Sequence, residues 1–168
     1  MAYQKLQAGK AWSVYPSDNT DIPDIGVGGA TGTTTTGSAT QLIDASRTGS
    51  DPDNMVTLGF IKAGIKAGMI AVNTTDGTQT TISRVVDETT LIVDQNIFAS
   101  TAKAYAIYGG TQNGAVLYIG TAGNIRITTV AGDDVTFVGI SAGSFFPVQV
   151  IKVWATGGTT ASNIIALW

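Results

Sequence analysis

The chain has 168 residues, enough for one domain of ordinary size or two small ones. It contains neither histidine nor cysteine, which excludes histidine-based triads, thiolate nucleophiles, disulfides and the usual zinc, haem and iron–sulfur ligands. The formal charge of −3, with 12% charged residues, argues against a nucleic-acid partner, because a protein that binds nucleic acid needs many Lys and Arg side chains on its surface.

The apolar stretches of the sequence give no targeting or membrane signal. The first residues lack the apolar core of a signal peptide, so we expect the chain to stay in the compartment where it is made. The stretch from Met55 to Val72 is interrupted by Lys62 and Lys66, and it therefore predicts no membrane span.

Short segments rich in Val, Ile, Thr, Tyr and Phe follow one another along the chain, and they predict an all-β fold with a β-sandwich or jelly-roll-like body and a small inserted β module. The expected strands are 11–15, 41–45, 69–74, 80–86, 90–94, 104–108, 115–119, 124–130, 135–139, 148–155 and 163–167. Asp76-Gly77 predicts a hairpin turn, since glycine supplies a positive φ. Period-two alternation places Ile125 and Ile127 on one face and Arg126 on the other.

Glycine- and threonine-rich segments divide the chain. Residues 26–40 carry no charge and predict a flexible linker, and a second glycine cluster begins at Gly109. We therefore expect a discontinuous body formed by residues 1–25 and 113–168, with a module at residues 41–112 inserted into it.

No motif indicates catalysis, and we predict that the chain is not an enzyme and holds no cofactor or metal. The dinucleotide-like glycines at 26–32 are followed by threonines rather than a helix. Asp51–Asn54 begins like a calcium loop, but its twelfth position is Lys62. Asp18, Asp21 and Asp24 are expected to accept backbone N–H bonds, with chance calcium binding as the alternative.

Five large aromatic side chains are the predicted buried or interface anchors, because such residues dominate protein contacts. They are Trp12, Phe145, Phe146, Trp154 and Trp168. The arm Met1–Lys10 is a further candidate for contact with a partner.

The C-terminal third carries several ordered motifs: residues 115–127, 131–137, 141–150, 153–161 and 165–168. Together with Tyr15–Pro23 they resemble the small spike-base proteins on the heads of tailed phages and gene-transfer agents. The match covers some 70 residues in two pieces. Segments 66–78, 82–87, 90–94 and 104–108 are similar to small β modules of phage structural proteins.

The resemblance implies a structural virion protein on the head surface, synthesised in the host cytoplasm. The family's place is beneath a vertex spike, but the insertion of residues 26–112 departs from the family pattern and favours a subunit that bridges capsomers. We therefore expect a decoration or cement subunit that binds the major capsid protein as a homo-oligomer, with a trimer favoured over a pentamer, and the alternative is a vertex spike base. The composition also suits a tail or neck component, and the scattered aromatics also suit a carbohydrate-binding module on the virion surface.

Overall fold

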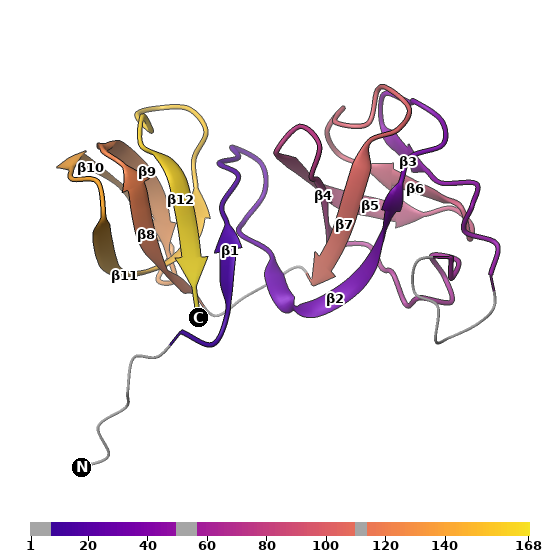
Figure 1. The fold of residues 1–168 in the computed structure, drawn as a ribbon, viewed down its shortest axis with the longest axis horizontal. Helices are drawn as coiled ribbons and strands as arrows, with labels where there is room; N and C mark the ends of the chain where they lie inside the picture. Colours follow the sequence, from indigo (N-terminus) through magenta and orange to yellow (C-terminus); the bar gives the residue numbers. More distant parts are fainter. Residues whose placement is uncertain (1–7, 50–56, 110–113) are drawn as a thin grey trace, which may run out of the picture. The chain divides into compact units, whose positions relative to one another are not determined.

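The computed structural model describes residues 8–49, 57–109 and 114–168. Over these residues the all-β prediction is confirmed: they form two antiparallel six-stranded sheets and no helix (Figure 1). No helix among them is long and apolar enough to cross a membrane. Asp51–Asn54 and most of the arm Met1–Lys10 lie outside the described residues.

The contacts divide the chain into two compact units. Unit 1 consists of residues 1–22 and 112–168, and unit 2 consists of residues 23–111. Each unit has one sheet and one hydrophobic core.

The sheet of unit 1 has the strand order β1-β12-β8-β11-β9-β10. Trp12 on one edge strand and Phe137 on the other both pack against the same buried cluster. A flat sheet of six strands would hold its edges far apart, so this sheet curves around its core and forms a sandwich-like body. Its strands are β1 (Ala11–Ser13), β8 (Ala115–Thr121), β9 (Gly123–Thr129), β10 (Asp134–Ile140), β11 (Ser144–Val153) and β12 (Ser162–Leu167).

The alternation predicted for β9 is confirmed, because Ile125 and Ile127 are fully buried while Arg126 is partly exposed. Period-two alternation along residues 148–154 predicts that Val150 and Val153 lie on opposite faces of the sheet, and for β11 this prediction is wrong. A register shift between Val150 and Lys152 inserts an extra residue, so that Val150 and Val153 both face the core.

The sheet of unit 2 has the strand order β2-β7-β4-β5-β6-β3. In Figure 1 the long strand β2 runs beside β7, with which it pairs in antiparallel fashion. The strands are β2 (Asp24–Thr33), β3 (Gln41–Ile43), β4 (Ile70–Asn73), β5 (Thr78–Val85), β6 (Thr90–Val93) and β7 (Ala104–Gly109). The predicted turn between β4 and β5 is present: Gly77 has a φ of +67° and donates its N–H to the Asn73 carbonyl.

The linker predicted for residues 26–40 is wrong over residues 26–33, which belong to β2. The glycines there permit close packing instead of flexibility. A Cβ on Gly29 would lie 2.6 Å from a methyl group of Ile65, and one on Gly32 would lie 2.6 Å from the Tyr105 hydroxyl oxygen. Large side chains therefore rest directly on the backbone of β2, which only glycine allows.

A buried charged cluster joins the segments of unit 2. The Arg47 guanidinium is fully buried and lies with its Nε 3.4 Å from Oδ2 of Asp44. It also donates to the Tyr105 hydroxyl and to the carbonyls of Thr31 and Leu58. The Tyr105 hydroxyl in turn donates to Asp44 at 2.6 Å. One side chain thus connects β2, β7 and the two segments that flank residues 50–56.

Removal of Arg47 is expected to destabilise unit 2 strongly. In Arg47→Met, the Asp44 carboxylate and two carbonyls would stay buried without their partner, which typically costs about 3–5 kcal/mol. Arg84→Met removes an exposed arginine from β5 and serves as the matched control, with an expected change within about 0.5 kcal/mol. The amide NMR signals of unit 2, followed during urea unfolding, measure both stabilities, and equal values would contradict a structural role for Arg47.

Candidate functional site

The five predicted aromatic anchors lie in unit 1 but in different environments. Phe146 is only 7% exposed and packs edge-on against Phe137, with ring centroids 4.6 Å apart. Its neighbour Phe145 is 67% exposed. Trp12 and Trp168 are partly buried against the core. The Trp168 backbone exchanges hydrogen bonds with Lys10, which fixes the last strand to the first.

Trp154 contacts charged residues. The guanidinium carbon of Arg126 lies 4.1 Å from the centre of its ring, and Nζ of Lys152 lies 4.2 Å from it. Its indole N–H donates to Thr128. Lys152 also donates to the carbonyl of Asp18, so this cation–π cluster holds the chain between β1 and β2 against the sheet.

The outward side of β12, β8 and the start of β11 is apolar. Phe145 pairs with Tyr118, and Tyr118 pairs with Ile165, so these side chains share one face of the sheet. Val116 and Leu167 form the next row on the same face. We call these five residues the apolar outer face. The rings of Tyr118 and Phe145 meet edge-on at 5.5 Å, and none of the five is fully buried.

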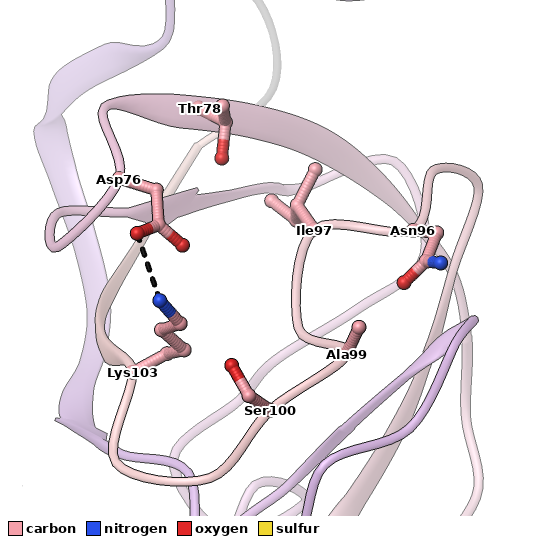
Figure 2. A pocket seen from close by; sticks show the side chains of 7 residues that line it. All are labelled: Asp76, Thr78, Asn96, Ile97, Ala99, Ser100 and Lys103. Atoms are coloured by element: carbon pink, nitrogen blue, oxygen red, sulfur yellow. Dashed lines mark hydrogen bonds and ion pairs between the residues drawn. The ribbon is translucent and has the colours of Figure 1, made fainter.

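A second feature lies in unit 2, where a hollow of about 230 Å³ opens between the β4–β5 turn and the β6–β7 loop, residues 94–103. Figure 2 shows the side chains that surround it. They are Asp76, Thr78, Asn96, Ile97, Ala99, Ser100 and Lys103. We call it the Asp76 hollow.

An ion pair crosses one side of the Asp76 hollow. Nζ of Lys103 donates to Oδ1 of Asp76 at 2.8 Å (Figure 2). The hydrogen bond from Lys103 lowers the pKa of the Asp76 carboxyl below its usual value, and a second one from the Asn73 amide adds to the effect. Asp76 is therefore a carboxylate at neutral pH, and its second oxygen is held in place by Asn73 at 2.8 Å.

The prediction that carboxylates near the N-terminus accept backbone N–H bonds is confirmed for Asp18 and Asp24. Asp18 accepts the N–H of Thr156, and Asp24 accepts the N–H of Gly26. The bond from Thr156 lowers the pKa of Asp18. Nowhere in residues 8–49, 57–109 and 114–168 do three acidic side chains gather as they would to hold a metal ion.

Sequence reasoning missed both the Asp76 hollow and the buried Arg47. The hollow combines a turn with a loop about 20 residues further along, and the pairing of β4 with β7 brings them together. A scan against protein-family models and searches of curated proteins and of solved structures find no match for the chain.

The adjacent phenylalanines provide a matched test of the two faces of β11. Phe146→Ala empties a buried site and is expected to lower the free energy of unfolding by about 3–5 kcal/mol. Phe145→Ala removes a mostly exposed ring, and its effect is expected to stay within about 0.5 kcal/mol. Urea denaturation measures both. A larger loss of unfolding free energy in Phe145→Ala than in Phe146→Ala would show that the buried and exposed faces of β11 are assigned wrongly.

Proposed function

We propose that this chain is a structural virion protein of a tailed phage, a decoration or cement subunit on the head surface. The observation that carries the proposal is the position of its spike-base-like motifs. Residues 115–127, 131–137, 141–150, 153–161 and 165–168 supply five neighbouring strands of one sheet, with Tyr15–Pro23 fastened across it through Lys152 and Ile151. The motifs therefore belong to one folded unit.

In this proposal the apolar outer face of unit 1 is the surface that binds the major capsid protein. It contains no charged side chain, and its geometry is fixed by main-chain hydrogen bonds across β12, β8 and β11. An apolar surface that includes two aromatic rings has the composition of the core of a protein interface. A subunit that contacts two neighbouring capsomers would bury additional surface where pressure inside the head pulls capsid subunits apart.

The subunit acts as a homo-oligomer, and a trimer suits a cement protein because it matches local threefold positions of the shell. The protein is made in the host cytoplasm and resides on the virion. Its location on an intact particle, determined by electron microscopy, tests this arrangement. Density only at the fivefold vertices would favour a spike base, and density on tail parts would favour a tail or neck component.

Loss of the apolar outer face is expected to abolish head binding. The double variant Tyr118→Ser and Phe145→Ser removes the half-buried ring of Tyr118 and the exposed ring of Phe145, and co-sedimentation with heads that lack the protein measures binding. Truncated aromatic anchors typically cost about 2 kcal/mol or more each, or about thirtyfold in affinity. Ile61→Ser alters an exposed apolar residue of unit 2 and should bind like the wild type. Unchanged binding of the double variant would refute the assigned surface.

Heads that lack the protein are expected to release DNA at a lower temperature than complete heads. The reason is that a ligand bound only to the intact shell stabilises it by mass action. Fluorescence of a DNA-binding dye during heating measures release, and added purified protein should restore the higher temperature. Identical release curves would exclude a cement role.

A further inference from the structure

The Asp76 hollow has polar side chains with unused hydrogen-bonding capacity. The side chains of Thr78, Asn96 and Ser100 line it, and they make no hydrogen bond to any other described residue. Together these three groups offer both donors and acceptors. In Figure 2 Thr78 and Ser100 lie on opposite sides of the opening, with Asn96 further along its rim.

A fully buried asparagine fixes the walls of the hollow. Nδ2 of Asn73 donates to Asp76 and to the Ile97 carbonyl, at 2.8 and 2.7 Å. Its Oδ1 accepts the N–H groups of Thr75 and Asp76. All hydrogen-bonding positions of this amide are therefore used to connect the β4–β5 turn to the β6–β7 loop.

Buried residues of unit 2 hold the β6–β7 loop in place. Phe98 is fully buried in the core of unit 2, and the buried Thr34 exchanges main-chain hydrogen bonds with Ala102 and Lys103. Its hydroxyl accepts the N–H of Lys103 as well. Ala102 adopts a φ of +59°, which is unfavourable for a residue with a Cβ and is maintained by these bonds. The polar groups of the hollow thus stand on a preorganised base.

The charges select a class of ligand. An anion would meet the Asp76 carboxylate, and Lys103 is already paired with that group. A cation would meet the Lys103 ammonium, and only one carboxylate lines the hollow. An apolar ligand would leave five polar side chains without water. A neutral molecule with many hydroxyl groups satisfies all of them, and its C–H groups can rest against Ile97 and Ala99.

We propose that the Asp76 hollow of unit 2 binds a single sugar unit of a neutral glycan. The volume of about 230 Å³ is below the ~300–1,000 Å³ of pockets for drug-sized ligands and suits one ring. Asp76 and Lys103 together can hold two adjacent hydroxyls, one as acceptor and one as donor, while Asn96 and Ser100 hold others. The inference does not rest on the proposed capsid role, since every lining residue belongs to unit 2.

Titration of the full chain followed by ¹H–¹⁵N NMR tests the proposal. The neutral probes are glucose, galactose, mannose and N-acetylglucosamine, and the charged probes are inorganic phosphate and Ca²⁺. At least one sugar should shift the amide signals of residues 76–78 and 96–103 with a dissociation constant on the order of 1 mM. No response to any sugar, or a response there only to phosphate or Ca²⁺, would overturn the proposal.

Variants of the lining residues assign the binding to the hollow. Asn96→Ala combined with Ser100→Ala should weaken sugar binding at least about fivefold, since each lost hydrogen bond costs about two- to tenfold. Thr78→Val removes one hydroxyl only and should also weaken sugar binding, independently of the other two substitutions. Gln95→Ala is the matched control, because Gln95 is exposed beside Asn96 and lies outside the lining. Equal affinities of all variants would overturn the assignment.

Discussion

The burial of Arg47 is the constraint on which unit 2 depends. A guanidinium without water needs a carboxylate and further acceptors around it, and Asp44, Tyr105 and two carbonyls supply them. These groups come from segments far apart in the chain, so the contacts of one guanidinium connect several parts of the core. Tyr105 also pairs across β4 and β7 with Asn73, the residue that connects the walls of the Asp76 hollow. The buried ion pair therefore supports the surface site through one strand pairing.

Most strands could be predicted because each one repeats apolar residues at the strand period and ends in turn residues. The hairpin at Asp76-Gly77 is the clearest case, since its glycine has the required positive φ. Strand β2 was missed because its sequence is low in complexity, which usually indicates flexibility. Its glycines are required instead by contact with Ile65 and Tyr105, and contacts between distant residues leave no local signal. The shift in β11 was missed for a similar reason, since Val150 and Val153 need partners in two strands.

The candidate sites differ in how far the sequence could reveal them. Large aromatics are conspicuous, and the sequence identified Phe145 and Phe146 together. It could not separate them, because which face of β11 is buried depends on register with β8. The Asp76 hollow consists of common polar residues, and only the topology β7-β4-β5-β6 brings its turn and its loop together. Thr78, Asn96 and Ser100 become candidates only when the structure shows that their side chains make no hydrogen bond to other described residues.

The two proposed binding surfaces rely on different interactions: unit 1 offers an apolar face, and unit 2 offers hydrogen-bonding groups. The apolar outer face presents side chains from paired strands, so its rows are already ordered and binding there loses little conformational entropy. Burial of such a face favours a lasting contact, as a shell requires. The Asp76 hollow offers a few hydrogen bonds that water also satisfies, so its net affinity for one sugar is small. Weak single sites become effective when repeated. If the proposed homo-oligomer is fixed to a shell through unit 1, many copies of the proposed sugar site would face one glycan-bearing surface together.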